Sequence, residues 1–323
     1  MLNRSKKGPD ILVFFTNYIC NSRCLMCNIW EKQGEDNVLN INQIENFFDN
    51  YLIKNFVKIV NLTGGEPTLD EKLEDIVKII LRKCKKIKRV DIPTNGIDTE
   101  IVVDKIERIL ALLFPYQNVR LTATIALDGI GKTHETIRGR TGIFENVIVT
   151  IKELKELAKL YPYFSLSLNT VVNRINYDKL DEVIDFAKRE QLYLNLTPVA
   201  VSEIGVESIN ASGDFSLNKA QKLDVIKAVN KLDEVQYLSP VNKKFLIDTL
   251  NENKRGIDCV FRQKKAILIE PNGDIYLCGN FKSFALGNIA IDKFEQLWGK
   301  AKLPENWRNI CSKCGSNCYL DEL

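Results

Sequence analysis

Histidine is almost absent from this chain of 323 residues, in which His134 is the only one. A Ser-His-Asp triad or a Cys-His pair needs an imidazole beside its nucleophile, so both mechanisms are nearly excluded. An excess of charge is missing too: 45 basic and 42 acidic residues give a net charge of +3. That balance indicates neither nucleic acid nor a membrane surface as a partner.

Long apolar runs are also missing. No stretch reaches the 18 apolar residues of a membrane span, and the apolar run at 11–15 is too short for the core of a signal peptide. We therefore expect a cytoplasmic protein. In that reducing compartment, nine cysteines indicate metal binding or catalysis rather than disulfides.

What the chain does contain is a soluble, globular composition, with 45% hydrophobic and 27% charged residues. The length suits one large domain of about 200 to 250 residues with a small appendage. The cysteines fall into an N-terminal group of three, the isolated Cys84, and five after residue 258. We expect Cys84 and His134 to be structural or exposed rather than catalytic.

Between the cysteine groups, short apolar runs alternate with longer amphipathic segments. The runs are rich in β-branched residues and end near Gly, Pro or Asn, as strands do; they are 11–15, 57–62, 88–92, 119–127, 163–172 and 192–198. In the other segments apolar residues recur every three or four positions, as on amphipathic helices; they are 41–54, 70–83, 100–113, 144–160, 177–190 and 216–235.

This alternation predicts an α/β fold with a parallel sheet and right-handed crossovers. Six units are fewer than the eight of a closed barrel, so we expect residues 11 to about 237 to form a partial (β/α)6 TIM-like barrel. Ligands of such folds collect at the C-terminal ends of the strands.

The unusual residues of the chain follow the predicted strands. The first strand is followed by NYICNSRCLMCNIW (17–30), and the second by Thr-Gly-Gly-Glu-Pro (63–67). Glycine lets a backbone approach a ligand closely, and Glu66 offers a carboxylate to a cationic group. Alone, this turn is equally consistent with a rigid strand-to-helix connection. Its position at the same end of the barrel as three thiols favours a binding site.

Residues 20–27, here called the thiol loop, carry three cysteines at spacings of four and three positions. Three thiolates are one ligand short of a closed zinc site, and no Cys or His in the next thirty residues completes one. They can instead hold three irons of a [4Fe–4S] cluster and leave the fourth iron open for a ligand. A zinc site that borrows a distant cysteine is the alternative.

The Cys-x3-Cys-x2-Cys pattern after the first strand and Gly-Gly-Glu-Pro after the second resemble the radical S-adenosylmethionine (SAM) superfamily over residues 11 to about 200. In that superfamily SAM chelates the open iron, and reduction yields a 5′-deoxyadenosyl radical that abstracts hydrogen from the substrate. The cofactor supplies the chemistry, and the protein orients it in a dry chamber. The resemblance implies an electron donor such as flavodoxin or ferredoxin.

The resemblance also implies roles for matching residues. The cluster ligands would be Cys20, Cys24 and Cys27. The methionine amine would be received by Thr63, Gly64, Gly65 and Glu66. Weaker candidates for ribose and carboxylate contacts are Asn95, Asp128 and Arg138. Two positions depart from the family: Met26 replaces a common aromatic residue whose backbone meets adenine, and Ala126 replaces a frequent serine, whose hydroxyl Thr124 would supply.

The C-terminal cysteines surround a predicted hairpin. Two apolar runs flank Pro-Asn-Gly-Asp (271–274), the second run ends at Cys278, and a helix-like segment follows around 293–301. Such cysteines can hold zinc or a second [4Fe–4S] cluster. The spacing resembles SPASM and shorter twitch auxiliary-cluster domains. A full SPASM domain has seven cysteines, so these five imply one cluster. Our first choice of ligands is Cys259, Cys278, Cys311 and Cys314, with Cys318 as the substitute.

We therefore expect a radical SAM barrel at 1–237, a linker at 238–258 and an auxiliary-cluster domain at 259–323. An auxiliary cluster suits net two-electron oxidations, for which Asp248, Asp258 or a spare thiol such as Cys318 are weak catalytic candidates. Peptide or protein modification is favoured, although a barrel that begins by residue 11 leaves no room for an N-terminal leader-binding domain. The alternatives are dehydrogenation or rearrangement of an amino sugar, cyclitol or nucleotide, and, remotely, a non-catalytic metal-binding module.

Overall fold

The structure is a computed structural model that describes residues 7–34, 38–199, 215–230, 240–251, 259–279, 284–305, 307–312 and 314. Its strands form one sheet in the order β6-β5-β4-β3-β2-β1-β7-β8-β9. They are β1 (Ile11–Asn17), β2 (Ile59–Gly64), β3 (Arg89–Thr94), β4 (Arg120–Ala126), β5 (Phe164–Val172), β6 (Tyr193–Pro198), β7 (Ala266–Ile269), β8 (Asp274–Tyr276) and β9 (Gly287–Asn288).

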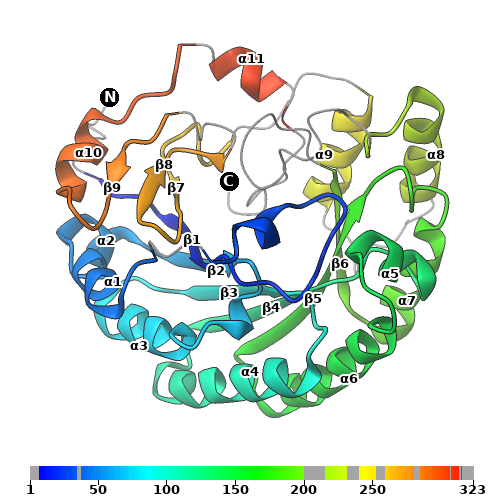
Figure 1. Cartoon of the computed structure of the whole chain (residues 1–323), viewed down its shortest axis with the longest axis horizontal. Helices are drawn as coiled ribbons and strands as arrows, with labels where there is room; N and C mark the ends of the chain where they lie inside the picture. The colour runs from blue at the N-terminus through cyan, green and yellow to red at the C-terminus, as the bar shows by residue number, and fades with distance from the viewer. Residues whose placement is uncertain are drawn as a thin grey trace.

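The helices follow the strands in the expected alternation. They are α1 (Ile41–Phe48), α2 (Tyr51–Phe56), α3 (Leu73–Lys83), α4 (Thr99–Leu113), α5 (Lys132–Arg138), α6 (Phe144–Leu160), α7 (Leu180–Glu190), α8 (Lys219–Asn230), α9 (Pro240–Leu250), α10 (Phe294–Lys300) and α11 (Trp307–Ser312). Figure 1 shows helices α1 to α4, α6 and α7 around the outside of the curved sheet. Among the described helices, none has the length and hydrophobicity to span a membrane.

Strands β1 to β6 are all parallel and form the predicted partial barrel. Burial along β4 alternates: Leu121, Ala123 and Ile125 are fully buried in the core shared with the helices, whereas Thr122 and Thr124 are half-buried on the other side. Strand β5 carries Ser165, Ser167 and Asn169 at the corresponding inner positions, of which Ser167 is buried and the other two are half-buried. The concave side of the barrel is therefore polar.

The predicted hairpin forms from β7 and β8, which are antiparallel, and Gly273 at its turn has a φ of +92°. It is joined to the barrel, however, because β7 pairs in parallel with the free side of β1. Ile11 of β1 lies opposite Ile59 on one side and Ala266 on the other. The strand that leads into the thiol loop thus lies inside the sheet.

Four segments differ from the expected helices. The predicted helix 41–54 is interrupted at Asp49 and Asn50, where the Asn50 side chain accepts the amide of Leu52 and starts α2. Helix α5 forms in a segment for which no helix was predicted, and α9 lies within the predicted linker. Of the predicted helix 216–235, α8 covers 219–230, and residues 231–235 lie outside the described part.

Candidate active site

The thiol loop leaves the C-terminal end of β1 and folds around its own sulfur atoms. Cys20 and Cys24 are buried and Cys27 is half-buried. The amide of Ser22 donates to Cys20 Sγ at 3.4 Å, and the Ser22 hydroxyl lies 3.1 Å from Cys24 Sγ. The Trp30 indole donates to the Cys27 carbonyl at 2.8 Å. The loop therefore places polar hydrogens beside two of the three predicted ligands.

The Gly-Gly-Glu-Pro turn packs directly against the backbone that precedes the thiol loop. The amide of Gly65 donates to the Asn17 carbonyl at 3.0 Å, and that of Glu66 to the Ile19 carbonyl at 2.7 Å. A Cβ atom at Gly65 would overlap the Ile19 carbonyl oxygen, and one at Gly64, whose φ is +137°, would lie 2.5 Å from the Asn17 oxygen. Only glycine allows this approach.

The Glu66 carboxylate points into the protein. One oxygen accepts the amide of Asn95 at 2.7 Å, and the other accepts the Thr68 hydroxyl at 2.7 Å and the Thr68 amide at 3.2 Å. Burial raises the pKa of Glu66, and these donors oppose the rise. Oε2 therefore ties the turn to the loop after β3, whereas Oε1 bonds within the segment that follows Glu66. The contact of residues 63–66 with the methionine amine remains a prediction.

Asn95 extends the same network to the thiol loop. Its side-chain nitrogen donates to the Asn21 side chain at 2.7 Å and lies 4.0 Å from Cys20 Sγ. Its side-chain oxygen accepts the amide of Ile97 at 2.9 Å. The loops that follow β1, β2 and β3 therefore meet at one end of the barrel.

Helix α5 holds the other side of the thiol loop. The Arg138 carbonyl accepts the amide of Arg23 at 3.0 Å and the Ser22 hydroxyl at 3.1 Å, and the Ile137 carbonyl accepts the amide of Leu25 at 2.9 Å. Gly139 caps the helix with a φ of +64°, and a Cβ atom there would overlap the Arg23 carbonyl oxygen. The thiol loop is thus held between α5 and the glycine turn.

A buried ion pair joins two of the weaker candidates. Arg138 Nη2 lies 2.7 Å from Asp128 Oδ2, and Arg138 Nη1 donates to Cys24 Sγ at 3.5 Å. Burial raises the pKa of Asp128, whereas Arg138 and the amide of Val171 oppose that rise. The remaining Arg138 Nε is buried and has no hydrogen-bond partner among the described residues, so it can still serve a ligand.

His134 stabilises this corner without contributing a catalytic imidazole. Its Nδ1 accepts the amide of Asp128 at 3.2 Å, and the side chain is fully buried. Burial, and then the positive charge of Arg138, lower the pKa of His134 to about 3. The imidazole is therefore neutral, in agreement with a structural role. Cys84 is likewise buried and remote in sequence from the other thiols.

The two remaining SAM candidates occupy different places. Met26 lies on the thiol loop, where the Asn173 side-chain nitrogen is 3.9 Å from its sulfur. Thr124 lies on the concave face of β4, and its hydroxyl is 2.9 Å from that of Ser167 on β5. Asn173, Ser167 and Ser22 were not among the predicted site residues. Polar residues at alternate positions of β5 were the available signal for Ser167.

Two of the C-terminal cysteines lie beside β1. Cys259 is buried with Ile11 and Ala266, and the half-buried Cys278 packs against the same apolar cluster. Cys314 follows α11, and its amide donates to the Cys311 carbonyl at 3.2 Å. Asp248 is half-buried on α9, while Cys318 and Asp258 lie outside the described residues. The structure therefore brings Cys259 and Cys278 together.

The donor set around the thiol loop fits an iron–sulfur cluster with three protein ligands. Burial raises the pKa of Cys20 to about 11, so its thiol stays protonated at neutral pH until a metal displaces the proton. Hydroxyl, amide and guanidinium donors at the sulfur atoms are the groups that stabilise bound clusters. Within the described residues no three Cys, His, Asp or Glu side chains already converge as metal ligands.

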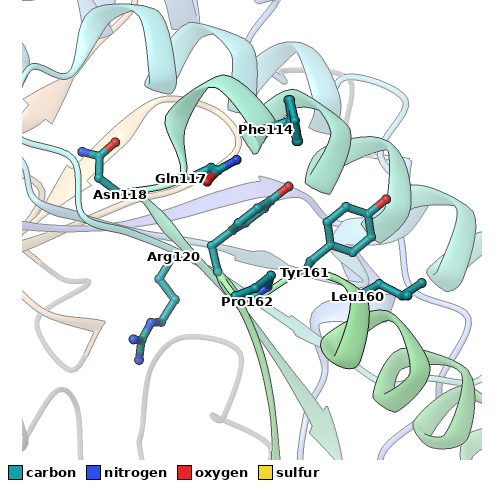
Figure 2. Close-up of a pocket in the computed structure, with 8 residues that line it drawn as sticks. Phe114, Gln117, Asn118, Arg120, Leu160, Tyr161 and Pro162 are labelled. Atoms are coloured by element: carbon teal, nitrogen blue, oxygen red, sulfur yellow. The ribbon is translucent and has the colours of Figure 1, made fainter.

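A hollow of about 340 Å³ lies at the opposite end of the barrel from these residues. Figure 2 shows Phe114, Arg120 and Tyr161 among the side chains around it. Arg120 begins β4, so the hollow lies at the amino ends of the strands. It is no part of the thiol-loop site.

Comparison with protein families places both cysteine groups in known domains. The profile described as the radical SAM superfamily matches residues 15–187, which is more than half of the chain. The profile named SPASM, an iron–sulfur cluster-binding domain, matches residues 259–319.

Individual relatives agree with these matches. The chain is 25% identical over 326 aligned positions, 97% of its length, to the antilisterial bacteriocin subtilosin biosynthesis protein AlbA of Bacillus subtilis, and it spans 65% of that protein. It is 27% identical over 243 positions to the GTP 3′,8-cyclase of Campylobacter fetus, covering 74% of this chain and 68% of the cyclase. The solved structure of anSMEcpe with bound AdoMet and Cp18Cys peptide has the same fold, with a TM-score of 0.63, 18% identity, and coverage of 94% of this chain and 88% of the other.

Proposed function

This chain belongs to the radical SAM superfamily, and we propose that it modifies a peptide or protein by radical chemistry at the thiol-loop site. The observation that carries the proposal is the extent of the similarity to AlbA. That similarity covers 97% of the chain, through both the barrel and the SPASM segment, whereas similarity to the GTP cyclase covers 74%. The modification would be a crosslink or another net oxidation.

The cluster and SAM, when bound, supply reductive cleavage of SAM to the 5′-deoxyadenosyl radical. Cys20, Cys24 and Cys27 would hold three irons. Thr63, Gly64, Gly65 and Glu66 would receive the methionine amine, and the Glu66 carboxylate also holds that turn in place. Arg138, through its Nε, remains a candidate for the SAM carboxylate.

The concave face of the barrel would receive the substrate. Thr124, Ser167 and Asn169 lie on neighbouring strands, and their side chains are uncharged donors and acceptors. Such groups suit the amides of a peptide backbone, which need hydrogen bonds but no countercharge. The thiol loop at the end of this face, in which Cys20, Cys24 and Met26 are buried, would help to exclude water from the reacting atoms.

The C-terminal segment would hold one auxiliary [4Fe–4S] cluster. Its proposed ligands remain Cys259, Cys278, Cys311 and Cys314, with Cys318 as the substitute. The parallel pairing of β7 with β1 supports this proposal, because it brings Cys259 against the strand that leads into the thiol loop. The auxiliary cluster would accept an electron from the substrate radical, and a flavodoxin or ferredoxin in the cytoplasm would reduce the SAM cluster.

Rearrangement of a nucleotide is the second candidate, and the similarity to the GTP 3′,8-cyclase favours it. One experiment separates the two. The protein is reconstituted anaerobically, and iron and sulfide are measured. It is then given SAM and dithionite together with GTP, or with extract fractions of the source cells before and after protease treatment.

Release of 5′-deoxyadenosine above the substrate-free background that protease abolishes would support peptide modification. Release stimulated by GTP, or by a small fraction that resists protease, would support the second candidate. No release from protein that carries its clusters would contradict the proposal. A Cys24→Ala variant, which should lose the SAM cluster, provides the negative control.

A further inference from the structure

Arg138 contributes a buried positive charge directly to a predicted cluster ligand. The residue is only 9% exposed, and its Nη1 donates to Cys24 Sγ at 3.5 Å. Its Nη2 lies 2.7 Å from the carboxylate of Asp128, which has no exposed surface. Guanidinium groups are permanently charged donors, so this contact combines a hydrogen bond with a fixed charge.

Both ends of Arg138 are held against the loop that carries Cys24. Its carbonyl accepts the Arg23 amide and the Ser22 hydroxyl, and that hydroxyl also contacts Cys24 Sγ. Its guanidinium cannot easily leave the sulfur, because Asp128 fixes the other side. The contact between Arg138 and Cys24 is therefore fixed by the surrounding hydrogen bonds and the ion pair.

Asp128 is itself held in place by surrounding loops. Its Oδ1 accepts the amide of Val171 at 2.8 Å, and its carbonyl accepts the Asn176 side chain at 2.8 Å. A guanidinium is not deprotonated in proteins, and the Asp128 carboxylate lies directly against the one of Arg138. Arg138 thus stays charged, and Asp128 partly offsets its field.

We propose that Arg138 is a positioning residue that, through Cys24, raises the reduction potential of the SAM cluster, and that Asp128 limits this rise. Hydrogen bonds to the sulfurs and the net charge nearby set the potential of iron–sulfur clusters. A positive charge favours the reduced, more negative state. The inference rests on the proposed function, since it requires that Cys24 binds the cluster.

The test is an EPR-monitored redox titration of the reconstituted, full-length protein. Added SAM changes the signal of a cluster with an open iron, which distinguishes this cluster from the auxiliary one. Arg138→Gln should lower the equilibrium constant for reduction about tenfold, or about 59 mV for a one-electron couple. Asp128→Asn should raise this equilibrium constant, because no carboxylate then offsets the positive charge of Arg138. Arg138→Lys should have a potential near that of the wild type.

Arg140, two residues away and exposed, provides the matched control, and Arg140→Gln should leave the potential unchanged. Unshifted potentials in Arg138→Gln and Asp128→Asn, or shifts in the same direction, would overturn the inference. If Arg138→Gln binds no cluster, Asp128→Asn still tests the inference, because only a higher reduction potential in that variant agrees with it. A wild-type protein without any SAM-responsive signal would instead contradict the proposed function.

Discussion

Alanine in place of Gly139 tests whether α5 holds the thiol loop in position. The left-handed φ of +64° at this residue is unfavourable for any residue with a Cβ atom, and the added methyl group would overlap the Arg23 carbonyl oxygen. The chain at Arg23 must move away to make room. That movement breaks the hydrogen bonds from the amides of Arg23 and Leu25 to the end of α5.

The expected cost follows from these two effects. A left-handed conformation costs about 1 to 2 kcal/mol for a residue with a side chain. Each of the two lost hydrogen bonds contributes roughly 0.5 to 1.5 kcal/mol. Gly139→Ala should therefore lower the free energy of unfolding by about 2 to 5 kcal/mol, a large share of the roughly 5 to 15 kcal/mol typical of a domain. The displaced loop should also bind less iron.

Gly142 provides the matched control. Its φ is +74°, but nothing lies within 4 Å of a Cβ atom built there, so Gly142→Ala should cost only about 1 to 2 kcal/mol and keep its iron. Anaerobic urea unfolding followed by circular dichroism gives the free energies, and iron and sulfide assays give cluster content. Equal destabilisation and equal iron content in the two variants would refute the proposed contact between α5 and the thiol loop.

Three further changes test individual side chains. The folded pKa of His134, about 3, lies below its unfolded value of 6.5. The free energy of unfolding of the wild type should therefore be highest above pH 6.5 and fall by about 1.4 kcal/mol per pH unit below it. Between pH 7 and pH 5, urea unfolding should show a smaller fall in this free energy for His134→Gln than for the wild type, and equal falls would count against this. Glu66→Gln should cost about 1 to 3 kcal/mol, because its NH2 group would face a donor such as the Asn95 amide; an unchanged urea midpoint would contradict that hydrogen-bond network. Cys84→Ala should leave iron content unchanged, unlike Cys24→Ala, since Cys84 lies in the hydrophobic core at the end of α3. Iron loss in Cys84→Ala would show that Cys84 matters to cluster binding.

The regular part of the fold could be predicted because burial there follows a period. The strand expected at 88–92 is observed at Arg89–Thr94, and the helix expected at 144–160 has those same bounds. In both, apolar residues recur at the spacing that the element itself imposes. The order of strands and helices then limits the topology to a parallel, partly closed barrel.

Helices α5 and α9 could not be predicted because their buried faces are partly polar. α5 buries Thr133, His134 and Arg138, whose partners lie on other loops. α9 buries Asn242, whose side-chain nitrogen donates to Tyr193 and Asn195 on β6. A polar residue looks the same in sequence whether water or a distant side chain satisfies it.

The candidate site shows the same limit. Cysteine spacing and the glycine turn predict which loops meet, because both are local patterns at the ends of strands. The inward direction of the Glu66 carboxylate and the contact of Arg138 with Cys24 arise from residues 29 and 114 positions apart, respectively. Contacts between residues so far apart follow no periodic pattern, so the sequence alone does not predict them.

The parallel pairing of β1 with β7 has a consequence for the order in which the protein is made. β1 leaves the ribosome before both of its partner strands. It can pair with β2 within about 50 residues, but its other side finds β7 only after residue 269 has been synthesised. Until then the backbone amides and carbonyls along that side of β1 form an open edge, which is a site for pairing with other chains. A ribosome-bound chain that stops before β7 should therefore depend on chaperones and aggregate more readily than one that extends past it. The cluster at the thiol loop is then loaded either while this edge of β1 is still open or after β7 has paired with it.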